Sequence, residues 1–340
     1  MGRDLTLYPR KASKKELKNY LESLGFIRCS HLWNWPKGTL NYSWFDMEEF
    51  KSIDGVSADI YPITGEKNNL TNNKWALHVR NLYSASYYDV KMLNKVLREA
   101  RKKFGGDIHG DYGKNRYAPL WEDNSTPISR GIAMVYEETM NRLKKVKFSI
   151  PESKICKRPE NNKETEMIRV IRSIDPMTDL YNAIVPFAVS AFEFFFSQTF
   201  QVLLKYDGYS KEKIKNHNQK IHFHDILLIK ENKKTIEGII AEQYSFQNLN
   251  QTNKAFKEWL DIDIKKILSE KRKIGNKVAF LENKILEIIE YRHDVVHHFL
   301  CDNNLTKEEL NNILSIVETA IKEVVIFLEE KYSVKIRDII

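Results

Sequence analysis

The fold of the C-terminal half is decided by the stretch LENKILEIIEYRHDVVHHFL, residues 281–300. Three of the nine histidines of the chain lie in its second half, next to an arginine and an aspartate. The spacing of the apolar residues predicts a helix over 277–300 with one apolar stripe about 120° wide. Arg292 lies in the middle of this stripe, and an arginine is always charged and costly to bury without a partner. We therefore expect Arg292 to lie at an interface.

The histidines of this stretch fit three kinds of site. His293 and His297 are four residues apart, so in a helix they share one flank of the stripe, whereas Asp294 and His298 face elsewhere. In a structural interpretation, Arg292 pairs with a buried carboxylate and the histidines solvate the helix end. In a metal site, His293 and His297 would bind zinc, but no further ligand stands at a matching spacing. In a phosphodiester-cleaving site, a histidine would move a proton and Arg292 would stabilise a pentavalent phosphate.

The hexapeptide RHDVVH, Arg292 to His297, resembles the R-x4-6-H signature of the HEPN superfamily. In that signature an arginine is followed by a polar residue, here His293, and a histidine closes the motif. The setting is similar too, because the motif ends a long helix late in a predicted helical bundle and one more helix follows. Glu193, a lone acid in the apolar run SAFEFFFSQTF, is also similar to a feature of that family. The resemblance covers roughly residues 170–335.

The resemblance implies a dimeric helical bundle that acts, in many members, as a metal-independent endoribonuclease. Arg292 and His297 would form half of a composite site that a second subunit completes. The ribose 2′-OH would attack the adjacent phosphate, with His297 as base or acid, and leave a 2′,3′-cyclic phosphate and a 5′-OH. Arg292 would stabilise the developing charge and His293 would orient the site. His298 also permits an R-x5-H spacing, so the choice between His297 and His298 stays open.

The resemblance also indicates a biological setting and its alternatives. HEPN proteins occur in toxin–antitoxin pairs, abortive-infection systems and other phage defences, so we expect RNA, a second copy and an antitoxin or defence-system protein as partners. We expect no metal and no cofactor. Some HEPN domains are catalytically inactive and only dimerise or bind nucleic acid, which is the main alternative. A metal-dependent phosphohydrolase, suggested by HFHD at 222–225 together with His293 and Asp294, is a distant one.

Two residues are expected to support the site. Glu193 stands among phenylalanines, so its carboxylate needs a cation, and Arg292 is the natural candidate if the two helices are neighbours. Asp294 follows the polar position of the motif and is the second supporting residue.

The chain divides into two regions of different texture. Residues 1–149 predict a mixed α/β domain that senses, regulates or binds RNA, with strands in 26–35, 40–45, 57–63 and 75–83. Residues 150–166 are polar, contain two prolines and predict a linker. Residues 167–340 predict an all-α, HEPN-like bundle. The expected helices of the whole chain are 14–24 with Ser13 as N-cap, 86–104, 128–146, 176–206, 236–258, 262–272, 277–300 and 305–332.

The charge balance permits RNA as a partner without demanding it. The chain has 340 residues, a formal net charge of +8 and a pI near 9.0. The basic stretch before the motif helix offers Lys271, Arg272 and Lys273 as RNA-binding candidates, although a solvated face is the default. The glycine-rich loop FGGDIHGDYGKNRY at 104–117 is a turn region by default. It offers three more candidates, Lys114, Arg116 and Tyr117.

The remaining features indicate a protein of the cytoplasm. The three cysteines are scattered, which fits a reducing compartment. Residues 1–15 have no apolar core, so we expect no signal peptide. Residues 181–204 are long and apolar enough to span a bilayer, but they contain Glu193 and are interrupted by Pro186. We expect a buried helix of the bundle there and no membrane contact.

Overall fold

The computed structural model describes residues 2–30, 35–152, 175–218, 220–274 and 277–336. The chain forms two compact units, Met1–Arg130 and Gly131–Ile339. The predicted linker lies outside the described residues from position 153 onwards. Helix α3 (Pro127–Ser149), which the sequence assigned to the first domain, belongs for most of its length to the second unit. Near the end of this helix, Lys147 forms a 2.8 Å salt bridge with Glu318 of the second unit.

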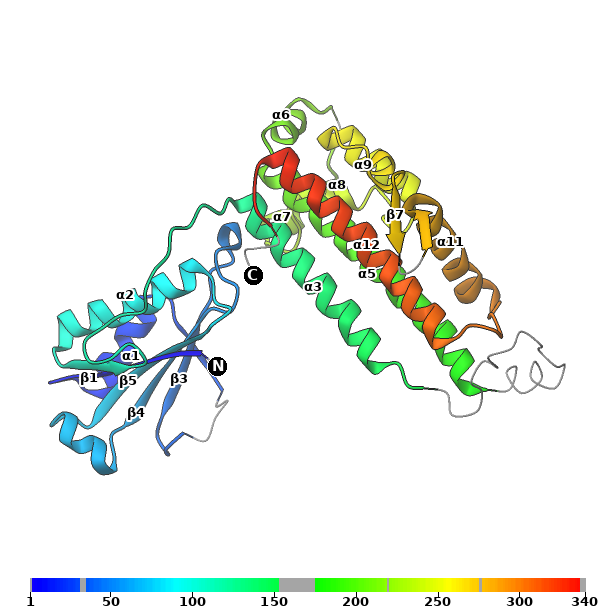
Figure 1. Ribbon diagram of the computed structural model, residues 1–340. Coiled ribbons are helices and arrows are strands. Elements are labelled where there is room, and N and C mark those ends of the chain that lie inside the picture. The colour runs from blue at the N-terminus through cyan, green and yellow to red at the C-terminus, as the bar shows by residue number, and fades with distance from the viewer. Residues whose placement is uncertain (1, 31–34, 153–174, 219, 275–276, 337–340) are drawn as a thin grey trace. The chain divides into compact units, whose positions relative to one another are not determined.

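The first unit is a six-stranded antiparallel sheet with helices on one face (Figure 1). The strand order is β2-β3-β4-β5-β1-β6. The strands are β1 (Gly2–Tyr8), β2 (Ile27–Cys29), β3 (Leu40–Trp44), β4 (Val56–Pro62), β5 (Trp75–Leu82) and β6 (Asp107–Gly110). The helices are α1 (Lys14–Ser23) and α2 (Tyr87–Phe104), with 3-10 turns η1 (Glu48–Phe50) and η2 (Gly65–Leu70). A strand lies in each of the four predicted ranges, but β2 covers only residues 27–29 of 26–35, of which 31–34 lie outside the described residues. Strands β1 and β6 were not predicted.

Side-chain alternation along the strands gives this sheet one apolar face and a second face on which polar residues accompany a small buried apolar cluster of Tyr8, Tyr61, Ile63 and Ala76. Leu5 and Leu7 of β1 are buried in the core that α1 and α2 cover. Their neighbours Asp4 and Thr6 point to the other face, because successive strand residues alternate. Both helices start at a serine that closes a capping box, Ser13 for α1 and Ser86 for α2.

The second unit is a helical bundle built around α5 (Pro176–Tyr206), which packs against α8, α9, α11 and α12. The shorter helices are α6 (Gly208–Asn216), α7 (Phe223–Lys230), α8 (Ile236–Ala241), α9 (Leu249–Leu260) and α10 (Ile264–Leu268). A small hairpin of β7 (Lys271–Ile274) and β8 (Lys277–Phe280) follows. The chain continues with α11 (Leu281–His293), a π turn η3 (Asp294–His298) and α12 (Lys307–Tyr332). Figure 1 shows α12 running alongside α5.

Helix α5 is a core helix of this bundle. It is the one helix among the described residues that is long and apolar enough to cross a membrane. Half of its most apolar window is buried inside the protein, and Phe192, Phe195, Phe196 and Phe200 are fully buried. The last two of these rings pack against Phe256 of α9, at centroid distances of 5.8 and 5.4 Å.

Three predicted helices differ from the structure. The helix expected over 236–258 is two helices, because the side chain of Asn248 caps α9 by accepting from the backbone N–H groups of residues 250 and 251. The helix expected over 262–272 ends at Leu268 and is followed by a strand. The helix expected over 277–300 begins four residues later, because 277–280 pair with β7.

Candidate active site

Helix α11 carries the motif on a firmly packed base. Its N-terminal half buries Leu281, Ile285 and Ile288, as the apolar stripe predicted. These residues face α5, α10 and α12, which are the helical neighbours of α11. Val278, also assigned to the stripe, instead lies in β8 and is 67% exposed.

A buried asparagine fixes the position of the motif. Asn182 of α5 is fully buried, and its Oδ1 accepts a hydrogen bond from the hydroxyl of Tyr291, the residue before Arg292. The same Oδ1 accepts from the backbone N–H of Asp302 (2.9 Å), and the Asn182 amide donates to the carbonyl of Asp302 (3.0 Å). Burial raises the pKa of Tyr291 to about 12, so this hydroxyl keeps its proton at neutral pH. Both chain ends of the 292–301 segment are thereby tied to α5.

Asn182 was not among the residues that the sequence pattern predicted for the site. The available signal was a lone amide in the apolar start of α5, because such a group is buried only with its hydrogen bonds made.

The three histidines of the motif form one cluster. After α11 the backbone follows a π turn over Asp294–His298, in which the hydrogen-bonded groups are five residues apart along the chain in place of four. The His293 ring lies 4.6 Å from that of His297 and 5.4 Å from that of His298. The expectation that His298 faces away from His293 was therefore wrong, because it assumed α-helical spacing. All three imidazoles are exposed to solvent.

Arg292 is half-buried at the end of α11, and its guanidinium makes no hydrogen bond or ion pair to any described residue. Apolar side chains next to it lie open to solvent: Val296 is 40% exposed, Phe299 87% and Leu300 60%. Phe299 has a left-handed backbone (φ +52°), which ends the π turn. Asp294 is half-buried, and its carbonyl accepts from the backbone N–H of Leu300 (3.2 Å). The charged guanidinium of Arg292, near exposed apolar side chains in the sequence, is thus available to a ligand.

Glu193 does not join this group of residues. Its carboxylate accepts a 2.7 Å hydrogen bond from the amide of Gln247. It lies eleven residues after Asn182 in α5, which is about 16 Å further along the helix axis. Glu193 lines a hollow of about 460 Å³, together with Ser197 and Gln201 of α5 and residues 232–246. Within one chain the expected pairing of Glu193 with Arg292 is therefore not made.

Comparison with known families decides what this bundle is. The RiboL-PSP-HEPN family matches residues 156–330, slightly more than half of the chain. The chain belongs to the RiboL-PSP-HEPN family. No curated protein and no solved structure gave a significant match. The first unit has no family match.

Membership makes the second unit a HEPN domain, as the motif resemblance predicted. HEPN domains commonly bind RNA and dimerise, and the family is generally one of ribonucleases. The matched region contains Asn182, Glu193, Arg292 and the three motif histidines.

The basic candidates before the motif helix are partly neutralised within the HEPN domain. Arg272 forms salt bridges with Glu270 (2.6 Å) and Glu323 (2.9 Å). Lys271 is exposed, with its ammonium 5.2 Å from the ring centroid of Phe280. Lys273 belongs to β7, and its side chain lies outside the described residues. These residues lie on the β7–β8 hairpin and not on a helix.

The RNA-binding candidates of the first unit differ in how far their side chains are already engaged within the protein. Lys114 is paired with Asp107 at 2.9 Å, and this contact together with Asn115 lowers the pKa of Asp107 to about 2. Arg116 is exposed. Tyr117 is half-buried, with the guanidinium of Arg98 5.3 Å from its ring centroid.

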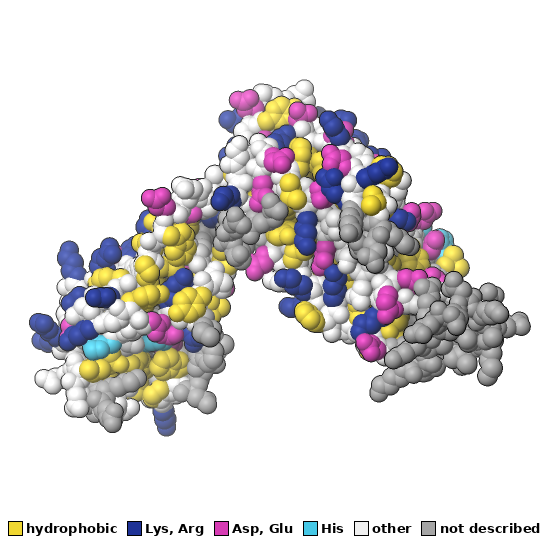
Figure 2. Space-filling view, in the orientation of Figure 1, with side chains coloured by type: hydrophobic (Ala, Val, Ile, Leu, Met, Phe, Trp, Pro, Cys, Tyr) yellow, Lys and Arg dark blue, Asp and Glu magenta, His cyan; other side chains and the backbone are white. Residues whose placement is uncertain are grey.

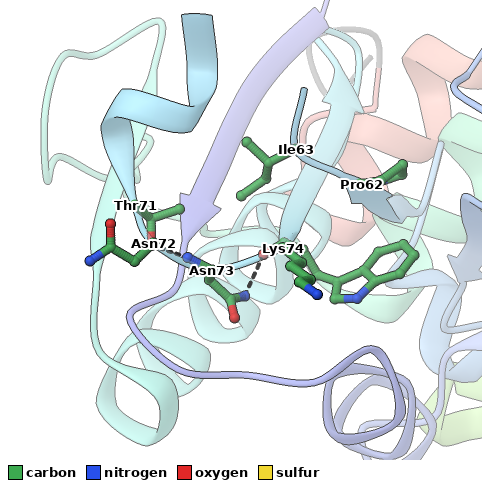
Figure 3. A pocket seen from close by; sticks show the side chains of 7 residues that line it. Pro62, Ile63, Thr71, Asn72, Asn73 and Lys74 are labelled. Carbon is green, nitrogen blue, oxygen red and sulfur yellow. Dashed lines mark hydrogen bonds between the residues drawn. The ribbon is translucent and has the colours of Figure 1, made fainter. Parts of the chain in front are cut away.

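Two further features of the described residues do not build a reaction site. No three His, Cys, Asp or Glu side chains among them converge as metal ligands would. A hollow of about 500 Å³ in the first unit is lined by residues 62–63 and 71–75 (Figure 3). Its polar groups serve the fold: Thr71 donates to the carbonyl of Pro9 (2.6 Å), and the amide of Asn73 donates to the carbonyl of Trp75 (2.8 Å).

Proposed function

We propose that the protein is a metal-independent endoribonuclease whose catalytic group is Arg292 with His297. The observation that carries the proposal is that Arg292, whose guanidinium has no partner among the described residues, directly precedes in the chain three imidazoles that form one cluster. A purely structural arginine would have its carboxylate nearby, and Glu193, the expected one, hydrogen-bonds Gln247 instead. A guanidinium free of such a partner is available to a phosphate.

Histidine and arginine have different roles in the proposed reaction. An imidazole takes the proton of the ribose 2′-OH, the 2′ oxygen attacks the adjacent phosphorus, and the bond from phosphorus to O5′ breaks. A second imidazole gives a proton to the leaving O5′, so the products are a 2′,3′-cyclic phosphate and a 5′-OH. Arg292 stabilises the extra negative charge of the pentavalent intermediate. His293 orients the neighbouring imidazole that it contacts.

The site is completed by a second copy of the chain. Val296, Phe299 and Leu300, which follow Arg292 in the chain, are exposed, and apolar surface of this kind is typical of interfaces. A two-fold contact through this end would bring two arginines and two sets of imidazoles to one cleft. Light scattering should give twice the monomer mass at micromolar concentration. A monomer at that concentration would contradict the composite site.

The setting we propose is a cytoplasmic toxin or abortive-infection effector, restrained by an antitoxin or another defence-system protein. The basis is the family, whose members act on RNA. Such a protein would stop growth of its host when produced alone, and His297→Ala would remove this toxicity. Equal toxicity of the two proteins would contradict the proposal.

A non-catalytic HEPN module is the second candidate. The observation that favours it is the exposure of all three imidazoles, with no described carboxylate or carbonyl orienting His297. One assay separates the two: purified protein is incubated with total RNA in EDTA, and the fragment ends are mapped. Cyclic phosphate ends in EDTA support the ribonuclease. Intact RNA in both EDTA and magnesium supports the module, and cleavage only with added metal contradicts the proposed chemistry.

A further inference from the structure

The first unit carries a surface that combines a stripe of cations on α2 with aromatic rings at the start of this helix and near Arg98. We call it the α2 surface. The inference drawn from it rests on the proposal that RNA is the substrate of the HEPN domain. Figure 2 shows Lys and Arg side chains gathered over this helix. Its members are Arg3, Tyr83, Tyr87, Lys91, Lys95, Arg98, Lys102, Tyr117 and Trp121.

The cations come from the amphipathic pattern of α2. Leu93, Val96, Leu97 and Ala100 are fully buried beneath the helix. Exposed Lys91, Lys95, Arg98 and Lys102 follow at spacings of four, three and four, so they form one stripe on the opposite side. Glu99 is the one exposed acid between positions 90 and 103. The helix is about 27 Å long, so this stripe runs along a sizeable part of the unit.

Aromatic rings are placed against these cations at the start of the helix. The Arg3 guanidinium lies 5.1 Å from the ring centroid of Tyr83 and 5.9 Å from that of Trp121. Trp121 meets Tyr87 edge-on at 5.9 Å, and the Lys91 ammonium lies 5.8 Å from the Tyr87 centroid. Trp121 is 45% exposed and Tyr83 54%, so their rings are open to a ligand.

A second aromatic position is fixed further along the helix. Asn94 is buried in α2 and exchanges two hydrogen bonds with the backbone of Ala118, at 2.8 and 3.0 Å. This anchors the neighbouring Tyr117, whose ring faces the Arg98 guanidinium. The structure therefore holds one aromatic group near each end of the basic stripe.

We propose that the α2 surface binds single-stranded RNA, the class of RNA on which the HEPN domain would act. Cations on the stripe would neutralise phosphates, and Trp121, Tyr87 and Tyr117 would stack bases. Bases are free to stack on side chains only in a single strand, which sets this surface apart from one for a duplex. An acidic protein or an anionic membrane would use the cations but leave the rings unused.

The test measures binding in the full chain carrying His297→Ala, so that the RNA stays intact. A fluorescein-labelled single-stranded RNA of about 12 nucleotides is titrated at several salt concentrations. Changing Lys91, Lys95 and Lys102 to Gln should weaken binding and reduce the salt slope by about 2, since each phosphate contact in a single strand contributes about 0.7. Trp121→Ala and Tyr117→Ala should each weaken binding about 10-fold, as for the loss of one stacked base.

The matched control changes Arg28, Lys37 and Lys74 to Gln, three exposed cations of the same unit outside the α2 surface. It should keep the parent affinity and salt slope. Circular dichroism should show an unchanged melting midpoint for all variants, and Trp121→Phe should restore most of the binding.

Three outcomes would overturn the inference. They are equal weakening by the control, unchanged binding in both aromatic variants, or equal affinity for a duplex of the same length. Loss in the cation variant alone would indicate a charge-only surface for an acidic protein or a membrane. Because binding is measured without cleavage, the α2 surface can fail this test while the ribonuclease proposal stands, and a protein whose HEPN domain is inactive can still bind RNA at the α2 surface of its first unit.

Discussion

The Tyr291 hydroxyl donates a hydrogen bond to Oδ1 of Asn182, and this contact joins the residue before Arg292 to the central helix of the bundle. Asn182 also holds the backbone of Asp302 through both its donor and its acceptor. One buried amide thus fixes the two ends of the segment that carries Arg292 and the three histidines. We interpret Asn182 as a positioning residue for the motif.

Removal of the Tyr291 hydroxyl should show whether its hydrogen bond positions the motif for cleavage or only stabilises the fold. Tyr291→Phe should cost about 1 kcal/mol of unfolding free energy, the usual value for one hydrogen bond. Cleavage should fall about 10-fold, less than the 10²-fold that a displacement of 1 Å can cause. The loss should appear in kcat and leave KM nearly unchanged.

Tyr20→Phe is the control for this variant. The buried Tyr20 hydroxyl donates to the carbonyl of Val96 at 2.7 Å, far in sequence from the motif. It should cost similar stability without loss of cleavage. Equal activity of Tyr291→Phe and wild type would contradict the positioning role.

Replacement of the motif arginine tests its two-pronged geometry. Arg292→Lys keeps the positive charge but loses the planar pair of donors that fits a phosphate. Cleavage should fall by about 10²-fold or more, as for loss of one transition-state donor. The melting midpoint should move little, because Arg292 has no ion pair among the described residues. A large drop in the midpoint with proportionate loss of activity would indicate a structural charge instead.

Glu193 should be dispensable for cleavage. Its described partner is the amide of Gln247, and Glu193→Gln keeps a group that can still hydrogen-bond there. We expect a change of less than about 1 kcal/mol in unfolding free energy and a cleavage rate within about twofold of wild type. A loss comparable to that of Arg292→Lys would mean that Glu193 meets the site across a dimer, which the single chain does not reveal.

The elements predicted from the sequence are correct where the local residue pattern agrees with the packing in the fold. Helix α5 was expected over 176–206 and has these bounds. Asp175 caps its start, and its apolar residues pack in the core. Strand β1 was overlooked, although Leu5 and Leu7 alternate with polar residues in the way of a half-buried strand.

The predictions that were wrong concern geometry that the spacing of apolar residues along the sequence does not determine. Residues 277–280 were read as helical because Val278 and Leu281 fit the apolar stripe, yet pairing of Ile274 with Lys277 makes a hairpin there. The π turn shifts the side chains after residue 293, so the contact of His298 with His293 could not follow from α-helical spacing. The partner of Glu193 depends on where α9 begins, which a single sequence leaves open.

The first unit has a pH-dependent contribution to its stability. His78 of β5 lies 3.2 Å from Asp4 and 3.4 Å from Asp59, with Trp35 packed on its ring at 5.3 Å. Burial works against the charge of His78, but the hydrogen bonds to the two aspartates outweigh it and raise its pKa above 6.5. A raised pKa in the folded state stabilises the fold below pH 6.5, and this stabilisation is lost as the pH rises through the folded value.

His78→Gln should therefore lose more stability at pH 6 than at pH 9. The measurement is the difference in unfolding free energy between wild type and His78→Gln, from urea titrations at both pH values. The pKa of Asp4 is lowered, mainly by its hydrogen bond to His78, so its own contribution persists across this range and fades only in acid. A difference that is constant or grows with pH would contradict the charged state of His78.

The rate of RNA cleavage in EDTA by His297→Ala, compared with wild type and with His298→Ala, tests the proposed site at its proton-transfer group. We expect cleavage by wild type with 2′,3′-cyclic phosphate ends, none by His297→Ala at an unchanged melting midpoint, and a milder loss in His298→Ala. Cleavage by His297→Ala at the wild-type rate would contradict the proposed site.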